Sequence, residues 1–314
     1  MIILKRGEAL KVLVTGGAGF IGSHVVEELL GHQYEVVVVD NLVTGFLENI
    51  SKDVKLHQVD LNDPKLEGVF EREKPDYVIH LAAQASVALS MTDPNLDFYT
   101  NTVGTFKTML LSKKHNVRKI IFASTAAVYG EPSYLPIDEK HLLNPLSFYS
   151  LSKFSAENYI KYNDQYNGLD SCILRFANVY GPRQNADGEA GVVAIFINRL
   201  LANECVFIYD GSQTRDFIFV KDVALACRLA MESNHKSVFN ISSCTETKID
   251  DLFYLIAGMT SVNTKPVHKP LRIGEIKRSI LDNEKARNEL NWHIQHTLLE
   301  GLKETYMYYS KLSD

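Results

Sequence analysis

Short apolar runs rich in β-branched residues alternate with helical patterns through the first half of the 314-residue chain. Five runs predict strands, and they lie at residues 11–15, 35–40, 54–59, 77–81 and 118–123. Strands that are apolar along their whole length are typical of a parallel sheet with helices on both faces, because neither face meets water. The pattern therefore predicts an α/β fold with a Rossmann-type doubly wound parallel sheet.

The alternation loosens after about residue 176, where glycine and proline interrupt the chain, first at Gly181-Pro182. Helical patterns continue at residues 192–202, 221–231, 249–257 and 297–309, and the clearest one of the first half is at 98–113. We expect a sheet domain over residues 1–176 and a smaller α/β domain over residues 177–314. Part of the second segment is expected to return to the sheet.

The charge and cysteine patterns argue against several classes of partner. The net charge is −5, with basic and acidic residues mixed along the chain, so no basic stripe indicates nucleic acid or an anionic membrane. No apolar stretch approaches the ~18 residues of a membrane span, and we expect no signal peptide. The four cysteines have no CxxC or zinc-ligand spacing, which predicts reduced, mostly core thiols in a cytoplasmic protein without a metal site. They are Cys172, Cys205, Cys227 and Cys244.

A glycine-rich turn, TGGAGFIG, follows the first predicted strand and opens a helix at Phe20 and Ile21. Gly16 permits the tight turn, Gly19 lets the backbone approach a pyrophosphate, and Gly22 allows the helix to lie close to the strand. A diphosphate can then bind at the positive end of the helix. A glycine string alone is weak evidence, but its place between a strand and a helix favours dinucleotide binding over a purely structural turn.

The second predicted strand ends in Asp40, at the distance from the glycines that suits a ribose-binding carboxylate. Such a carboxylate can accept both ribose hydroxyls of NAD and repels the 2′-phosphate of NADP. On its own, Asp40 could be a helix cap, but the turn that follows, with Asn41, Thr44 and Gly45, favours ribose binding. We therefore predict NAD as the cofactor of residues 1–176.

Two further strand ends supply weaker candidates for the same cofactor. Asp60, followed by Leu61, could hydrogen-bond the adenine amine or could be an ordinary turn aspartate. The end of the fourth predicted strand is rich in small residues, which leave room for a cofactor or simply pack against a helix. These positions are Leu81, Ala82, Ala83 and Gln84.

Tyr149 and Lys153 form a Tyr-x-x-x-Lys pair one turn apart on a predicted helix, so both side chains share a face. About one such pair is expected by chance, and its place after the fifth strand is what makes it informative. A phenol base that works near neutrality needs about 4 kcal/mol of stabilisation, which one ammonium about 4 Å away in a partly shielded site supplies. We predict Tyr149 as general base with Lys153 and the NAD⁺ cation beside it. The alternative is a surface tyrosine and a solvated lysine.

The fifth predicted strand ends in two hydroxyls, Ser124 and Thr125, at the edge where α/β sheets bind ligands. Either hydroxyl could hydrogen-bond the substrate oxygen that is oxidised. Alternatively, both residues only cap the loop.

These motifs together resemble the extended short-chain dehydrogenase/reductases of the NAD-dependent epimerase/dehydratase family, and within it the UDP-hexose 4-epimerases of the UDP-glucose 4-epimerase type. The matching stretches are TGGAGFIGSH (15–24), DNLVTG (40–45), HLAAQASV (80–87), ASTAAVYGEP (123–132), RFANVYGPRQ (175–184), GEAGVVAIF (188–196), QTRDFIFVKDVA (213–224) and RIGEIKRS (272–279). One departure is the turn at 209–212, which is one residue shorter than the family pattern, and residues 1–10 precede the usual start.

The resemblance implies a role for each matched residue. Thr125 takes the place of the catalytic serine or threonine, with Ser124 as its neighbour, beside Tyr149 and Lys153. The implied UDP-sugar substrate contacts a second set of residues. In this set Asn178 and Val193 hold the sugar nucleotide, Tyr209 lies beside the uracil, Arg215 and Arg272 clamp the diphosphate, Glu275 binds the nucleotide ribose and Ser279 lies at the sugar C2 substituent.

The implied activity is epimerisation at C4 of a UDP-hexose through a transient 4-keto sugar, with tightly retained NAD. The resemblance also implies a homodimer, since family members commonly pair through helices around 98–113 and 152–166. Other sugar-nucleotide enzymes of the family remain alternatives, including a UDP-glucuronate epimerase. A dehydratase or decarboxylase needs an acid–base carboxylate just after the fifth strand, where this chain has Ala126-Ala127. A non-catalytic NAD sensor generally lacks the tyrosine–lysine pair.

Ser279 is expected to set the sugar specificity. The resemblance implies a large aromatic residue here in relatives restricted to UDP-glucose and UDP-galactose, and a small one where N-acetylated sugars are accepted. An acetamido group cannot enter a filled pocket without overpacking, which costs about 1–3 kcal/mol. Since serine is small, we expect UDP-N-acetylglucosamine and UDP-N-acetylgalactosamine to be accepted as well. The alternative is that Ser279 faces solvent.

Overall fold

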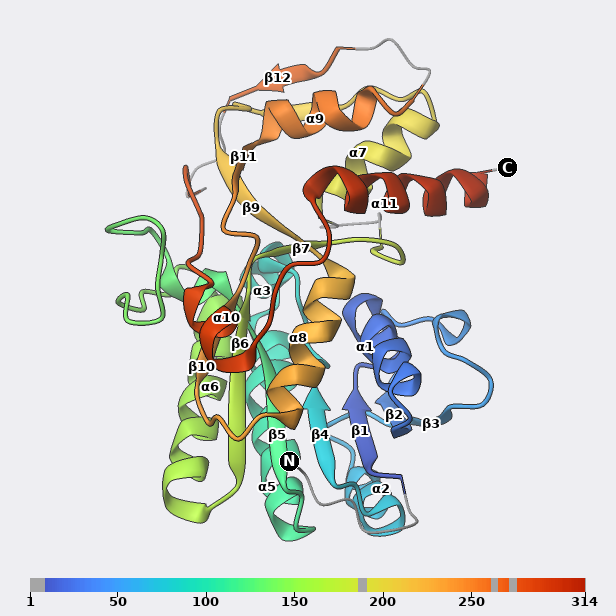
Figure 1. Ribbon diagram of the computed structural model, residues 1–314, viewed down its shortest axis with the longest axis vertical. Helices are drawn as coiled ribbons and strands as arrows, with labels where there is room; N and C mark the ends of the chain where they lie inside the picture. The colour runs from blue at the N-terminus through green and yellow to red at the C-terminus, as the bar shows by residue number, and fades with distance from the viewer. Residues whose placement is uncertain (1–8, 186–190, 261–264, 271–275, 314) are drawn as a thin grey trace.

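A seven-stranded parallel sheet forms the centre of the molecule (Figure 1). The computed structural model describes residues 9–185, 191–260, 265–270 and 276–313. The strand order is β10-β6-β5-β4-β1-β2-β3. Successive strands are therefore added toward one edge from β1 to β3 and toward the other edge from β4 onward, which places a topological switch point between β1 and β4. The strands are β1 (Lys11–Thr15), β2 (Glu35–Asp40), β3 (Lys55–Gln58), β4 (Tyr77–His80), β5 (Lys119–Thr125), β6 (Asp170–Phe176) and β10 (Val238–Ile241). The predicted Rossmann-type α/β fold is confirmed, and β10, from the second half of the chain, forms one edge.

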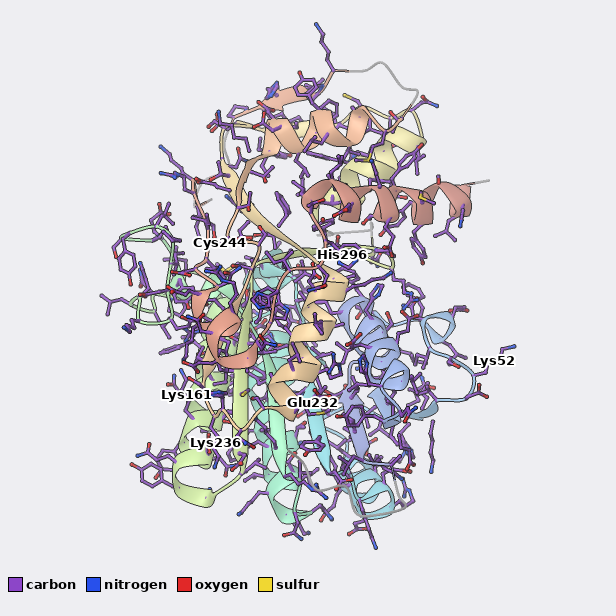
Figure 2. All side chains as sticks on the ribbon, in the orientation of Figure 1. Lys52, Lys161, Glu232, Lys236, Cys244 and His296 are labelled. Atoms are coloured by element: carbon purple, nitrogen blue, oxygen red, sulfur yellow. The ribbon has the colours of Figure 1, made fainter. Side chains whose placement is uncertain are left out.

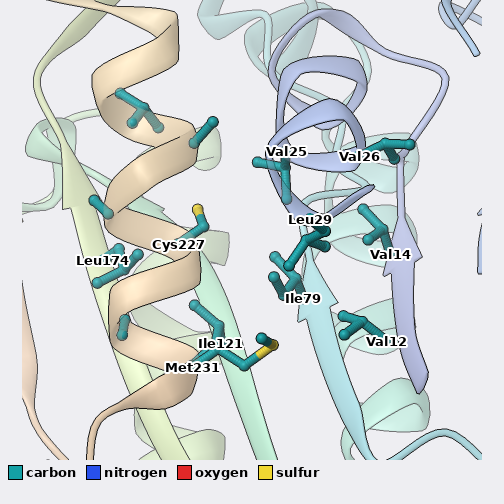
Figure 3. Close-up of a cluster of buried hydrophobic side chains, with 14 of the residues drawn as sticks. Val12, Val14, Val25, Val26, Leu29, Ile79, Ile121, Leu174, Cys227 and Met231 are labelled. Atoms are coloured by element: carbon teal, nitrogen blue, oxygen red, sulfur yellow. The ribbon is translucent and has the colours of Figure 1, made fainter. Parts of the chain in front are cut away.

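Helices cover both faces of this sheet because its strands are apolar on both sides. Val12 and Val14 of β1 lie on the side of α1 (Phe20–Gly31), in an apolar cluster to which α8 (Val220–Glu232) also contributes, as Figure 3 shows. Leu13, between them, points to the opposite apolar cluster. That second face is covered by α2 (Lys65–Glu73), α5 (Gly104–Lys114) and α6 (Phe148–Asn167). The alternation of side chains along each strand thus fills two separate cores.

A second lobe lies beyond the carboxyl ends of the strands, at the top of Figure 1. Its three-stranded sheet has the order β11-β9-β7, and a two-stranded sheet pairs β12 with β8. Its strands are β7 (Asn178–Tyr180), β8 (Phe207–Tyr209), β9 (Thr214–Phe219), β11 (Glu246–Lys248) and β12 (Val267–Lys269). Its helices are α7 (Val192–Leu201), α9 (Ile249–Ala257) and α11 (Leu298–Ser313), which enclose an apolar cluster of their own. α10 (Glu284–Leu290) packs beside β10 and α8, back at the sheet.

The helix predicted at residues 98–113 is wrong in one respect, because its first part is not α-helical. After α3 (Val87–Thr92) and α4 (Pro94–Asp97), the chain forms a π-helix over Phe98–Val103 before α5 begins. The wider turn buries Asn101 and Thr102, and the Asn101 side chain donates to the Gln84 carbonyl at 2.9 Å. Wide turns of this kind often accompany functional sites. Two short 3₁₀ turns, Leu47–Asn49 and Ala126–Tyr129, complete the described elements.

The cysteines are free in the structure, with Cys172 and Cys227 buried and Cys205 and Cys244 exposed. Only half of them are therefore core thiols, fewer than the sequence pattern indicated. Among the described helices, none is both long enough and apolar enough to cross a membrane.

Candidate active site

The glycine turn after β1 leaves a cradle at the start of α1. Gly16 has φ +71°, and a Cβ there would lie 2.6 Å from the backbone nitrogen of Ala82. A Cβ on Gly22 would overlap the Gly16 carbonyl oxygen. Gly19 is different, because its φ is −77° and a Cβ would meet only that same oxygen, at 3.3 Å. No side chain caps the first N–H groups of α1, so the space beside Gly19 fits the diphosphate of a dinucleotide.

Asp40 lies at the end of β2, directly beside this cradle. Its Oδ2 accepts the Ala18 N–H at 3.0 Å and its Oδ1 accepts the Leu42 N–H at 2.8 Å. A carboxylate has about four acceptor positions, so two remain for ribose hydroxyls. No helix begins at Asp40, and the turn that follows it lies close, with a Gly45 Cβ position 3.1 Å from Asp40 Oδ1. The geometry therefore suits a ribose-binding carboxylate better than a helix cap.

The weaker cofactor candidates divide into turn residues and residues at the β4 edge. Asp60 accepts the Asn41 side-chain amide and the Asn62 N–H, each at 2.8 Å, so it organises the turn that contains Asn41. Leu61 is buried in the apolar cluster, while Thr44 is exposed. After β4, the residues from Leu81 to Gln84 are all half-buried beside the glycine turn. The small side chains of Ala82 and Ala83 therefore lie where a cofactor bound at the glycine turn could pass.

Tyr149 and Lys153 lie in the first two turns of α6, whose start is fixed by a capping box between Ser147 and Ser150. The Lys153 Nζ donates to the Ala123 carbonyl at 3.0 Å, and its side chain is 3% exposed. Burial lowers the pKa of Lys153 to about 8. Burial also raises the pKa of Tyr149, and a hydrogen bond with the Thr125 side chain opposes this rise. The predicted lowering of the Tyr149 pKa is therefore not present in the chain alone.

The two hydroxyls at the end of β5 point in different directions. Thr125 meets Tyr149, and its oxygen also accepts the Ala127 N–H at 3.1 Å. The Ser124 hydroxyl instead donates to Glu157 at 2.6 Å, within a buried ion pair in which Arg175 donates to both Glu157 oxygens. Of the two, Thr125 is the hydroxyl placed to contact a substrate, while Ser124 fixes the end of the strand.

One buried carboxylate near Tyr149 and Lys153 was not predicted from the sequence. Asp97 is 1% exposed, and its Oδ1 accepts the side-chain amides of Gln84 at 3.0 Å and Asn101 at 2.9 Å. Its Oδ2 is buried without a hydrogen-bond partner. Burial raises the pKa of Asp97, and its charge acts on both Tyr149 and Lys153. Asp97 ends α4, Asn101 lies in the π-helix and Gln84 follows β4, so their meeting depends on the fold and no motif in the sequence identified it.

The second lobe carries the residues expected to bind substrate. Asn178 begins β7 and is exposed, and Arg215 lies on the neighbouring β9, so one small sheet holds both. The Val193 side chain is 1% exposed inside the lobe's core, which leaves its backbone N–H, in the uncapped first turn of α7, as its means of contact. Tyr209 ends β8, and the shortened turn closes through Asp210 and Gly211 with φ of 64° and 86°.

The last three expected substrate residues lie in one stretch. Arg272 and Glu275 are outside the described residues. Ser279 is half-buried in the segment that follows them. This segment runs along β9, where the Arg215 guanidinium donates to the Ile276 carbonyl at 2.8 Å.

A parallel sheet with an uncapped glycine turn, an acidic β2 end and a tyrosine–lysine pair defines an NAD-dependent enzyme of the short-chain dehydrogenase/reductase type. More narrowly, the chain belongs to the NAD dependent epimerase/dehydratase family, whose model matches residues 12–242. Its cofactor is NAD.

Three solved structures are similar over nearly the whole chain. The UDP-glucose 4-epimerase of Thermotoga maritima, with UDP-glucose, is 44% identical with a TM-score of 0.94 and covers 97% of this chain and 100% of its own. The UDP-N-acetylglucosamine 4-epimerase of Methanobrevibacter ruminantium, in complex with UDP-N-acetylmuramic acid, is 35% identical with a TM-score of 0.93, covering 97% and 99%. The UDP-glucose 4-epimerase of Thermus thermophilus, in complex with NAD, is 39% identical with a TM-score of 0.89, covering 96% and 99%.

Proposed function

We propose that this enzyme inverts C4 of a UDP-hexose, interconverting UDP-glucose and UDP-galactose through a transient 4-keto sugar. The observation that carries the proposal is the meeting of Tyr149 and Thr125 at the carboxyl edge of the sheet, with Lys153 beneath them. The whole-length similarity to UDP-glucose 4-epimerases supports it.

Each residue has a distinct task in this scheme. Tyr149 takes the proton from the sugar O4 and later returns it, while Thr125 hydrogen-bonds the same oxygen. Burial raises the pKa of Tyr149, and this rise must be offset before the phenol can act as a base. Lys153 contributes positive charge near the phenol, which favours its ionised form. NAD bound in the glycine cradle accepts and returns the hydride of C4, and its positive charge further favours the phenolate. The keto sugar turns over within the site while its UDP group stays bound.

The UDP group is held by the second lobe in this proposal. Arg215 and Arg272 neutralise the diphosphate, Glu275 binds the ribose, Asn178 and the Val193 backbone contact the sugar nucleotide, and Tyr209 lies beside the uracil. Guanidinium groups suit this task because they bind phosphate oxygens in pairs. In this proposal residues 1–176 form the domain that binds the cofactor, and residues 177–314 form the domain that binds the substrate.

We extend the proposed substrates to UDP-N-acetylglucosamine and UDP-N-acetylgalactosamine. Ser279 leaves space at the sugar C2 position, and an acetamido group needs that space. The similarity to a UDP-N-acetylglucosamine 4-epimerase supports this extension.

We also propose a homodimer, in the cytoplasm. One surface of the sheet domain is rich in exposed apolar side chains, contributed by the π-helix, α5 and α6. They are Phe98, Tyr99, Phe106, Leu110, Leu151, Tyr159, Tyr162 and Tyr166. A patch of this kind on a globular protein usually marks an interface, and a second copy of the chain offers the same apolar face.

The proposal is tested by supplying UDP-galactose and identifying the product sugar nucleotide. UDP-glucose is the expected product. A 4-keto-6-deoxy sugar would indicate a dehydratase, although no carboxylate occupies Ala126 or Ala127, and no turnover would indicate a sensor.

A further inference from the structure

Asp216 is a buried carboxylate on β9, next in sequence to Arg215, and it is 1% exposed. Within the described ranges, no lysine, arginine or histidine forms an ion pair with it. Its charge is instead met by hydrogen-bond donors, since Oδ1 accepts the Ser243 N–H at 2.8 Å and the Ser243 hydroxyl at 2.7 Å. Oδ2 accepts the N–H groups of Cys244 and Leu281, each at 3.2 Å.

These four bonds join three segments that are far apart in the sequence. The first is β9 itself, and the second is the turn after β10, where Cys244 adopts φ +54°. Figure 2 shows Cys244 at the level where the sheet domain and the second lobe join. The third is the segment 276–281, which we call the substrate strap, because it carries Ser279 and directly follows Arg272 and Glu275. One carboxylate therefore fixes the strap against the strand that carries Arg215.

Other contacts also bind the strap. Arg278 pairs with Glu246 through two bonds of 2.7 Å, yet its side chain is 61% exposed. Exposed ion pairs contribute little, because water and salt screen their charges. Hydrogen bonds to a buried carboxylate are charge-assisted and about twice as strong as neutral ones. The Thr214 N–H donates to the Lys277 carbonyl at 2.9 Å, which is a neutral bond. Asp216 reaches the strap through a charge-assisted bond to the Leu281 N–H, and the Arg215 guanidinium makes another, to the Ile276 carbonyl at 2.8 Å. Asp216 differs from Arg215 in that it also ties the strap to the turn after β10.

We propose that Asp216 is a positioning residue for substrate binding, holding the substrate strap so that its side chains meet the sugar nucleotide together with Arg215. This inference rests on the proposed function, and it names a residue that touches neither the cofactor cradle nor the reacting atoms. Its loss should therefore weaken UDP-sugar binding and leave the chemical step and NAD retention nearly unchanged.

The variant Asp216→Asn tests the inference with almost no change in shape. An amide presents an NH₂ group toward two of the four donors, so it cannot accept all four bonds. We expect KM for UDP-galactose to rise at least tenfold, kcat to change less than threefold and the NAD content to stay at the wild-type level. Calorimetric binding of UDP alone, which requires no turnover, should weaken at least tenfold. Hydrogen exchange of the strap amides should be faster.

Asp282→Asn is the matched control. Asp282 lies directly after the strap, and its Oδ1 accepts the Glu284 N–H at 2.8 Å at the start of α10. Asparagine forms this side-chain-to-backbone turn as aspartate does, so KM and UDP binding should not change. If Asp216→Asn fails to fold, Ser243→Ala removes the hydroxyl bond to Asp216, together with the longer bonds of that hydroxyl with Thr245. KM should then rise about two- to fivefold.

Three results would overturn the inference: UDP binding by Asp216→Asn equal to that of the wild type, a fall in kcat at unchanged KM, or loss of NAD together with substrate binding. An unchanged KM in Ser243→Ala would also contradict it. A wild-type enzyme that neither binds UDP nor inverts C4 would refute the proposed function first, which separates that failure from a failure of Asp216.

Discussion

At the scale of single residues, the site holds several buried ionisable side chains, and the charge of each affects the ionisation of the others. Burial lowers the pKa of Lys153 to about 8 and raises the pKa of Tyr149, so burial alone favours the neutral forms of both side chains. Asp97 adds a carboxylate with an unpartnered oxygen, and Glu157 is already paired with Arg175. The Tyr149 side chain therefore stays protonated, and cannot accept a proton, until further positive charge stabilises its phenolate form.

Tyr149→Phe should retain the fold and bound NAD but lose most turnover, because the proton acceptor disappears while the ring packing remains. Loss of a general base typically lowers the rate by about 10²–10⁴-fold. The measurement is kcat with UDP-galactose, alongside the NAD content of the purified protein. Tyr159→Phe, on the exposed side of the same helix, is the control and should be unaffected. Activity above a tenth of the wild type would exclude Tyr149 as the base.

Ser279→Tyr should suppress epimerisation of UDP-N-acetylglucosamine at least tenfold and leave UDP-glucose largely unaffected. The aromatic ring would fill the space needed by the acetamido group, and overpacking costs about 1–3 kcal/mol. The measurement is kcat/KM for both substrates, with Ser279→Ala as the small-residue control. Equal effects on the two sugars, or a wild type that ignores the N-acetylated one, would refute the specificity role.

At the scale of elements, the π-helix, α5 and α6 face the candidate site on one side and form an exposed apolar surface on the other. Their inner faces place Asn101 and Lys153 at the site, while their outer faces present exposed aromatic rings. Tyr162 and Tyr166 of α6 are in ring contact at 4.4 Å and are 63% and 62% exposed. Large exposed rings in one cluster are explained if a second copy covers them.

Tyr162→Glu should convert the proposed homodimer into a monomer, because a buried, unpaired carboxylate in an apolar interface is strongly unfavourable. Light scattering after size-exclusion chromatography measures the mass in solution. Tyr254→Glu, an equally drastic change at an exposed position on α9 in the second lobe, is the control and should leave the mass unchanged. A wild-type protein that is monomeric at micromolar concentration would contradict the dimer.

At the scale of the whole molecule, what the sequence could predict follows from local rules. The apolar strands, the glycine turn and the tyrosine–lysine spacing are short-range patterns, so the α/β fold and the position of the cofactor cradle could be predicted. The orientation of Ser124 depends on its contact with Glu157, 33 positions further along the chain. The burial of Asp97 depends on how the π-helix that follows it packs. No local pattern encodes those contacts.

Global stability should depend on Glu73, the buried last residue of α2, which has Lys11, Lys55 and His57 around it. Burial opposes ionisation of Glu73, but hydrogen bonds from Lys55 and His57 outweigh it and lower its pKa to about 2. Because the folded-state pKa is depressed, the stabilisation is present above about pH 4.5 and is lost as pH falls toward 2. Glu73→Gln should lower the free energy of unfolding by about 1–3 kcal/mol at pH 7.

Urea unfolding of wild type and Glu73→Gln between pH 7 and pH 3 measures this dependence. The difference between the two proteins should narrow below pH 4.5. Glu71→Gln, at an exposed position on the same helix, should differ little from the wild type at any pH. A difference that stays constant with pH would show that the charge of Glu73 is not what stabilises the fold.

The most direct test of the central claim, inversion at C4 by removal and return of the same hydride, uses UDP-galactose with deuterium at C4. We predict UDP-glucose that keeps the deuterium at C4, since the hydride returns within one closed site, and no net change in the redox state of NAD. The product is analysed by NMR and mass spectrometry in ordinary water. Loss of deuterium to solvent, or a product whose C4 is not inverted, would contradict the account.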